Sequence, residues 1–155
     1  MIRDEHFQRD SMGLCWVAMR LLQNKIQIEI HKKNELINVE QLLLLMELNF
    51  EDGLRPSVLA KRMVKSKGTI SSLIRHAQRN EFISVSNDPK HKNAKRVFLT
   101  VYGKSLHDEL APIVDRVVKE SLGDVTREEL QTVNAVMGRI FDRLDSGMFD
   151  NEDKA

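Results

Sequence analysis

Small polar and basic residues recur along one side of a helix that the sequence predicts from Lys67 to Asn80. Four apolar residues repeat there at helical spacing and define a buried face: Ile70, Leu73, Ile74 and Ala77. At 100° per residue, the opposite face carries Gly68, Ser71, Ser72, Arg75, His76 and Arg79. Hydroxyl and guanidinium groups at this spacing can hydrogen-bond to base edges and phosphates, and an arginine fork matches O6 and N7 of guanine.

The start of this helix adds groups suited to an anion. Ser66 is a typical N-cap residue, with Thr69 three positions later. Backbone N–H groups near residues 66–68 can bind a phosphate. We therefore name as candidate nucleic-acid contacts on this helix Ser66, Lys67, Gly68, Thr69, Ser71, Ser72, Arg75, His76 and Arg79. Lys61, Arg62 and Lys65 are further candidates for phosphates, which position a protein without specifying sequence.

A second set of candidates lies in a basic loop at residues 87–95. It begins with the turn-forming residues Asn87, Asp88 and Pro89. Its candidate contacts are Lys90, Lys92, Asn93 and Lys95. Ile83 and Val85 before the loop, and Val97, Leu99 and Val101 after it, alternate as in short strands. The sequence thus predicts a hairpin with a basic tip.

Charge is strongly segregated along a chain of 155 residues whose net charge is only +1. Between Leu54 and Leu106 there are twelve lysines and arginines but only two acids, a net charge of +10. The rest of the chain has twelve basic and twenty-one acidic residues, a net charge of −9. A basic middle in an acidic chain indicates a surface that binds a polyanion.

The elements that must position these residues are mostly helical. We expect a first helix from Ser11 to about Lys33 and a second that begins at Asn38, with a capping box to Gln41, and ends near Gly53 as a C-cap. A short helix begins at Pro56, and residues 63–66 turn into the helix described above. Two short helices this close together are a helix-turn-helix candidate, and the hairpin that follows makes it a winged helix.

Two helices are predicted after the hairpin. One begins at Thr100 and contains Pro112, which should kink or break it. The other begins with a capping box at Thr126–Glu129. The predicted fold class is mainly α with a small β-wing, a winged helix-turn-helix with helices from both termini forming a dimerisation region.

Composition and motifs exclude several classes of protein. No apolar run approaches the roughly 20 residues of a membrane span, and the amino terminus has no apolar signal core, so we expect a cytoplasmic protein that makes no membrane contact. One cysteine excludes an intrachain disulfide framework. The sequence has no Gly-rich phosphate loop after a strand, nucleophile elbow or metalloprotease motif, so we expect no enzyme and no cofactor.

An ordered set of motifs resembles the MarR (multiple antibiotic resistance regulator) family. The matching segments are 58–60 (Val-Leu-Ala), 66–71 (Ser-Lys-Gly-Thr-Ile-Ser), 81–83 (Glu-Phe-Ile), 88–89 (Asp-Pro) and 96–103 (Arg-Val-Phe-Leu-Thr-Val-Tyr-Gly). The resemblance covers about residues 11–146. It implies a bacterial transcription regulator that binds duplex DNA as a homodimer on a pseudo-palindromic operator, and family habit favours a repressor.

The resemblance also implies the domain arrangement. Residues 1–35 and 104–146 would form the helical dimerisation region, pairing the first and last helices of two copies. Residues 36–103 would form the DNA-binding region, and 147–155 a flexible acidic tail. Independently, the first and last helices carry more apolar surface than one small core needs.

The predicted wing departs from the family. Many members carry Asp-x-Arg at the wing tip, and that arginine enters the minor groove; here the corresponding residues are His91 and Asn93. Members commonly respond to small aromatic or phenolic compounds, and we expect such an effector between the dimer helices and the winged region. Its walls would come from the first helix, the second helix and the start of the fifth.

Two alternatives stay open. Cys15, near the start of the first helix, matches the place where some members sense peroxides, although the tyrosines expected near that thiolate are missing. The other alternative is a winged helix used for protein contacts without DNA. A metal site would need Cys15 and the histidines His6, His31, His76, His91 and His107, which show no metal-ligand spacing, so none is predicted.

Overall fold

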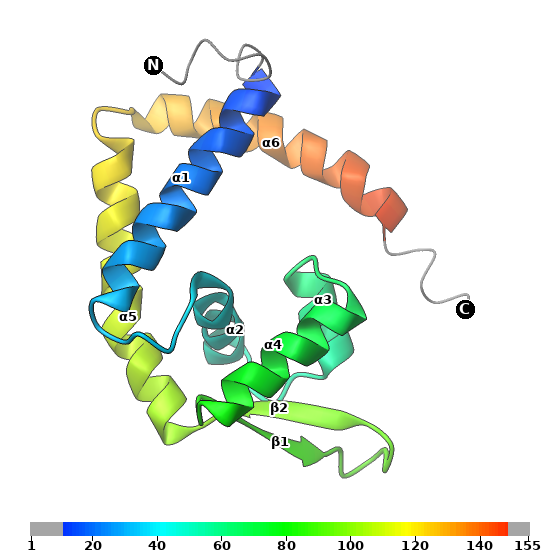
Figure 1. Cartoon of the computed structure of the whole chain (residues 1–155). Helices are drawn as coiled ribbons and strands as arrows, with labels where there is room; N and C mark the ends of the chain where they lie inside the picture. Colours follow the sequence, from blue (N-terminus) through cyan, green and yellow to red (C-terminus); the bar gives the residue numbers. More distant parts are fainter. Residues whose placement is uncertain (1–10, 149–155) are drawn as a thin grey trace. The chain divides into compact units, whose positions relative to one another are not determined.

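The computed structural model describes residues 11–148 (Figure 1). Along the chain it has α1 (Ser11–His31), α2 (Val39–Phe50), α3 (Pro56–Arg62), α4 (Lys67–Arg79), β1 (Ile83–Asn87), β2 (Lys95–Leu99), α5 (Val101–Leu122) and α6 (Arg127–Met148). The predicted class, mainly α with a two-stranded antiparallel wing, is confirmed. The acidic tail predicted at 147–155 lies, from residue 149 on, outside the described residues.

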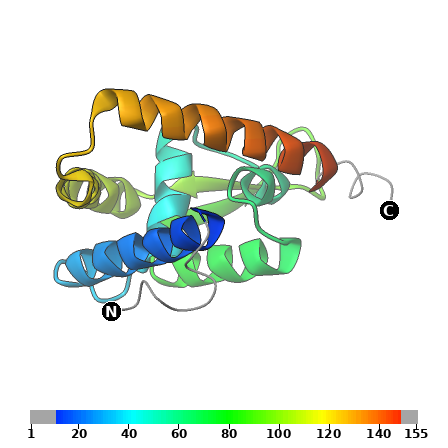
Figure 2. The ribbon, with the colours of Figure 1, turned by 90° about the horizontal axis from the view of Figure 1, so that it is seen from above.

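Helix α2 is the centre of the first of two compact units, which ends at Ser121. It lies between α5 and the α3–α4 pair in both views (Figures 1 and 2). Leu44, Leu45 and Leu48 are buried, and α2 packs against α1, α3, α4 and β2. The predicted capping box is present, since Asn38 Oδ1 accepts from Gln41 N at 2.8 Å and Gln41 Oε1 accepts from Asn38 N at 3.1 Å.

The end of α2 differs from the prediction. The helix ends at Phe50 with Glu51 as an extended C-cap, so Gly53 does not cap it. Gly53 instead adopts φ 72° in the bend that follows, a conformation that glycine enters easily. The reason is tertiary: the chain must straighten so that Leu54 pairs with Val97 of β2.

The turn between α3 and α4 is tight, as predicted. Val64 N donates to Lys61 O at 3.2 Å, and Lys65 N donates to Ala60 O at 2.9 Å. These bonds hold Val64 at φ 52°, a conformation that a β-branched residue rarely adopts. Leu59, Ala60, Ile70 and Ile74 bury the facing sides of the two helices.

The hairpin pairs Ile83 with Leu99 and Asn87 with Lys95. The prediction that Val101 belongs to the second strand was wrong, because β2 ends at Leu99 and Val101 begins α5 with 92% of its surface exposed. Thr100 explains the early start of the helix. Its Oγ1 accepts from Gly103 N at 2.9 Å and donates to Glu81 O at 2.6 Å.

Gly103 is placed where no side chain fits. A Cβ atom there would lie 1.9 Å from the carbonyl oxygen of Phe82, which also accepts from Thr100 N at 3.2 Å. Phe82 is fully buried, and its ring contacts that of Tyr102. The entrance to the hairpin and the start of α5 therefore pack backbone to backbone.

Pro112 was expected to kink or break this helix, and it does not break it: α5 continues to Leu122, while its ribbon changes direction along its length (Figure 1). Pro112 removes one helical hydrogen bond, while buried Leu110 and Val117 on either side anchor the helix in the core.

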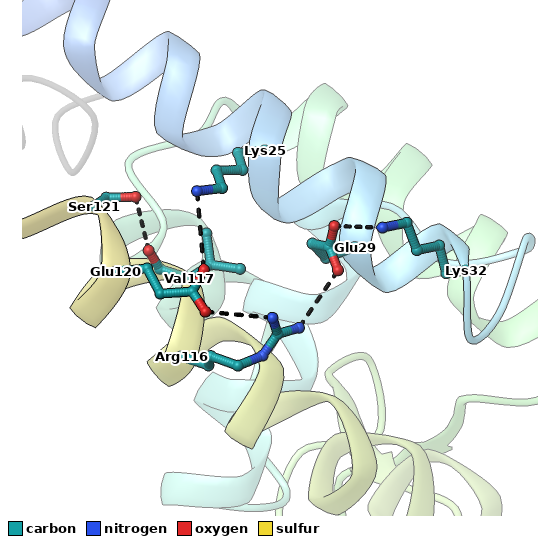
Figure 3. A network of polar contacts seen from close by, with 7 residues as sticks. All are labelled: Lys25, Glu29, Lys32, Arg116, Val117, Glu120 and Ser121. Atoms are coloured by element: carbon teal, nitrogen blue, oxygen red, sulfur yellow. Dashed lines mark hydrogen bonds and ion pairs between the residues drawn. The ribbon is translucent and has the colours of Figure 1, made fainter.

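Charged residues link α5 to α1 (Figure 3). Arg116 lies 3.4 Å from a Glu29 carboxylate oxygen and 3.5 Å from one of Glu120, while Lys25 lies 3.9 Å from Glu120. The side chains of Lys25, Arg116 and Glu120 are about half exposed, so solvent screens these pairs and each contributes little to stability.

The second unit, from Leu122 on, contains α6. The predicted capping box is present: Thr126 N donates to Glu129 Oε2 at 2.8 Å, and Glu129 N donates to Thr126 Oγ1 at 3.2 Å. Five large apolar side chains of α6 are exposed: Val133, Val136, Met137, Phe141 and Leu144. No helix in the described part of the chain is long and apolar enough to span a membrane.

We predict opposite effects of alanine at two helical glycines. Gly103→Ala should cost about 3 kcal/mol or more, because the new Cβ meets backbone that cannot move independently. Gly138→Ala should gain about 1 kcal/mol, because nothing lies within 4 Å and alanine favours the helix. Urea unfolding midpoints measure both. A Gly103→Ala variant as stable as the wild type would contradict the close approach to Phe82.

Candidate nucleic-acid interface

Helix α4 presents the polar face that the sequence predicts. Ile70, Ile74 and Ala77 are buried and Leu73 is half-buried. The exposed residues on the other side are Lys67, Gly68, Thr69, Ser71, Arg75, His76 and Arg79, and Ser72 is half-buried. An exposed helix face of small polar residues followed by arginines has the shape and hydrogen-bonding groups that a DNA groove requires.

Ser66 and Thr69 have a structural role at the start of α4. Ser66 Oγ accepts from Thr69 N at 3.2 Å and lies 2.9 Å from Thr69 Oγ1. Both residues remain exposed. The cap therefore fixes the direction of the first turn of α4, and with it the backbone N–H groups near Gly68.

The wing holds its basic residues at the surface. Lys90, Lys92, Asn93 and Lys95 are all exposed, as is His91. The turn is fixed by backbone bonds, His91 N donating to Asp88 O at 3.3 Å and Ala94 N to His91 O at 2.9 Å. Lys95 Nζ donates to Asn87 Oδ1 at 2.7 Å across the hairpin. Helix α4 packs against β1, so the polar face of the helix and the wing belong to neighbouring elements.

Sequence reasoning did not place Asp88, Arg55 and Arg96 among the site residues. The Asp88 side chain is fully buried, and its Oδ2 accepts from Arg55 Nη2 at 2.8 Å, Arg55 Nε at 3.1 Å and Arg96 Nε at 3.0 Å. We call these three residues the wing-base cluster. The available signal was charge: Asp88 is one of two acids in the segment of net charge +10.

The pKa of the Asp88 carboxyl lies well below its usual range. The largest cause is the hydrogen bond from the Lys90 backbone N–H, which is 2.9 Å from Oδ1; the Arg55 side chain comes next, and Arg96 adds to it, while burial acts in the opposite direction. Asp88 is thus held ionised at the junction of α3, the wing and β2.

Two clefts lie near the elements named above. One, of about 730 Å³, lies beside α4 and is lined by residues of the α1–α2 connection, the start of α2, the α3–α4 turn and α4, including Glu40, Lys65 and His76. The other, of about 400 Å³, lies where α2, β2 and the start of α5 meet, and is lined in part by Leu48, Leu99 and Lys104. Only the second has walls from two of the three elements expected to line an effector site.

Cys15 is exposed on α1. Among residues 11–148 no three His, Cys, Asp or Glu side chains are grouped as metal ligands. His6, one of the histidines considered in the sequence, lies outside the described residues.

We predict that Asp88 makes folding sensitive to acid. Because its pKa is lowered on folding, the carboxylate contributes stability above its unfolded pKa of about 4, and this contribution is lost as pH falls toward the folded value. Asp88→Asn should lower stability at neutral pH and flatten the loss below about pH 4. Urea unfolding between pH 3 and 7 measures this. Asp115→Asn, at an exposed carboxylate of α5, is the control, and parallel profiles for Asp88→Asn and wild type would refute the role of Asp88.

Comparison with known proteins gives structural likeness at low sequence identity. No protein-family model and no curated protein matches the sequence. The solved structure of the transcriptional regulator SlyA aligns with a TM-score of 0.80 at 18% identity, over 88% of this chain and 95% of that one. BpsR of Bordetella bronchiseptica, whose DNA binding is regulated by 6-hydroxynicotinic acid, aligns at 0.79 and 19% identity, over 89% and 97%. MepR of S. aureus, solved in complex with DNA, aligns at 0.79 and 21% identity, over 86% and 98%.

These alignments cover most of each chain, and the elements agree with those that the motifs predicted. AbsC of Streptomyces coelicolor, described as a MarR family transcriptional regulator, aligns at 0.78 and 19% identity, over 88% of this chain and 97% of that one. The chain therefore has the winged helix-turn-helix fold of the MarR-type transcriptional regulators.

Proposed function

We propose that this protein is a MarR-family transcription regulator that binds duplex DNA sequence-specifically, with α4 in the major groove and the wing against the flanking backbone. The observation that carries the proposal is the exposed face of α4, where the side chains of Ser71, Arg75 and Arg79 are open to solvent and a basic wing follows the helix. A regulator of this kind acts on the nucleoid and needs no catalytic group.

Each exposed residue has a role that follows from its chemistry. Gly68 and Ser71 are small enough for the first turns of α4 to approach the bases closely. Arg75, two turns from the helix start, has the reach and fork geometry for guanine O6 and N7. Lys67 and Arg79, at the two ends of α4, are suited to phosphates on either side of the groove.

We propose that the protein acts as a homodimer paired through α1 and α6. The support is apolar surface on both helices: Leu14, Trp16, Met19, Leu21 and Ile28 of α1, and the five residues named above for α6, are exposed. Trp16 alone has 66% of its surface exposed. So many exposed large apolar side chains on two helices mark an interaction site. A two-fold dimer would read a pseudo-palindromic operator.

We propose further that the protein represses transcription from its operator, and that a small aromatic or phenolic effector releases it from this DNA. The cleft of about 400 Å³ between α2, β2 and the start of α5 supports this, because its volume suits a small ligand. It adjoins Thr100 and Val101, where α5 begins. A ligand there would act on the junction between α5 and the wing.

Selection of bound sequences from a random duplex pool tests the DNA-binding proposal. We predict a two-fold-related motif for the wild type, and a motif degenerate at one position in each half for Arg75→Ala, which should bind the selected duplex about 1–3 kcal/mol more weakly. Lys67→Ala is the matched control, because loss of a phosphate contact weakens all duplexes alike.

If Arg75→Ala leaves both the motif and the affinity unchanged, the assignment of α4 to the major groove is wrong. No enrichment by the wild type, with binding insensitive to salt, would instead favour a winged helix used for protein contacts.

A charge on the apolar face of α6 should separate the dimer. Phe141 is 58% exposed in the single chain, and a dimer paired through α6 would bury it. Phe141→Asp would therefore bury an unpaired carboxylate in the dimer interface. Sedimentation equilibrium should then give a monomer mass. Ala135→Asp adds the same charge on the opposite face of α6 and should leave the dimer intact. A dimer that survives Phe141→Asp would exclude α6 from the interface.

A further inference from the structure

The wing-base cluster of Arg55, Asp88 and Arg96 holds more positive charge than its structural role requires. One guanidinium would neutralise the buried carboxylate, yet two arginines share its Oδ2 atom. The cluster therefore keeps a net charge of +1 at the base of the wing. A buried carboxylate with two arginines is stable only if the surplus charge reaches solvent or an anion.

Both arginines do reach the surface. The Arg55 side chain is 38% exposed and that of Arg96 is 36% exposed, whereas that of Asp88 is 0% exposed. Arg55 uses Nε and Nη2 for Asp88, and Arg96 uses Nε for Asp88 and Nη1 for Gly53 O at 2.9 Å. A guanidinium has five N–H groups, so each arginine retains donors for a further acceptor.

The position of the cluster fits the backbone of a duplex. Arg55 immediately precedes α3, the first helix of the helix-turn-helix, and Asp88 begins the turn that carries Lys90 and Lys92. Arg96 lies on β2 beside Lys95. In helix-turn-helix proteins the first helix crosses the DNA backbone while the second enters the major groove.

We infer that Arg55 and Arg96 form a phosphate-binding pair for the DNA backbone, which Asp88 orients, a role that rests on the proposed function. Asp88 fixes both forks before DNA arrives, so less side-chain entropy is lost on binding. The pair gives the wing a backbone anchor at its base, where His91 and Asn93 leave its tip without an arginine.

Salt dependence separates a phosphate contact from a purely structural role. The logarithm of the DNA association constant falls with the logarithm of salt concentration by about 0.9 for each phosphate contact. Arg55→Gln and Arg96→Gln should each reduce this slope by about that amount per protomer. Arg116→Gln is the matched control, because Arg116 is also an arginine paired with carboxylates but lies on α5, and the slope of this variant should equal that of the wild type.

Ethylation interference on the selected duplex places the contact. For the wild type, ethylation of each contacted phosphate should reduce binding. For Arg55→Gln, ethylation of one of these phosphates in each half-site should no longer reduce binding, while ethylation of the others still does. Thermal unfolding of each variant monitors the fold. Arg55→Lys keeps the charge, so it should retain most of the slope even if it is less stable.

Three results of these measurements can be distinguished. Reduced slopes for both glutamine variants, with interference lost at one phosphate, support the inference. Folded glutamine variants with wild-type slope and interference would overturn it and leave the cluster as a structural link only. If the wild type itself shows no salt-dependent DNA binding, the proposed function has failed, and this inference with it.

Discussion

The buried carboxylate of Asp88 links the three segments that the candidate interface requires. Arg55 comes from the start of α3, Arg96 from β2, and the Lys90 N–H from the wing turn. An ionised group without exposure is tolerated only where its oxygens are fully hydrogen-bonded, and here they accept from four N–H groups. Losing one partner would therefore loosen the wing from the helix-turn-helix, because the remaining charge would be buried without compensation.

A second constraint lies at the other end of the hairpin. The Phe82 carbonyl accepts from Thr100 N, and Gly103 allows α5 to pass against it. Tyr102 Oη in the same turn accepts a hydrogen bond from Asn34 Nδ2 at 2.8 Å, so the α1–α2 connection is joined to the start of α5. The start of α5 is thus joined to the residue before β1, and β1 in turn packs against α4.

The sequence was sufficient for features set by local pattern and chemistry. The polar face of α4, the capping boxes at Asn38 and Thr126 and the basic hairpin all follow from spacing alone. The errors lie where distant segments compete with local preference. Gly53 does not cap α2 because Leu54 must pair with Val97, and Val101 leaves the strand because Thr100 caps α5. The wing-base cluster could not be assembled from sequence, because Arg55 and Asp88 are 33 residues apart and meet only in the folded chain.

If two copies of α4 and its wing contact one duplex, hydroxyl-radical footprinting on a selected duplex should show two protected regions related by two-fold symmetry. These regions should be centred about one helical turn, roughly 34 Å, apart, with further protection outside each from the wings. A single protected region without symmetry, or no protection at low salt, would mean that two copies do not bind the duplex in this way.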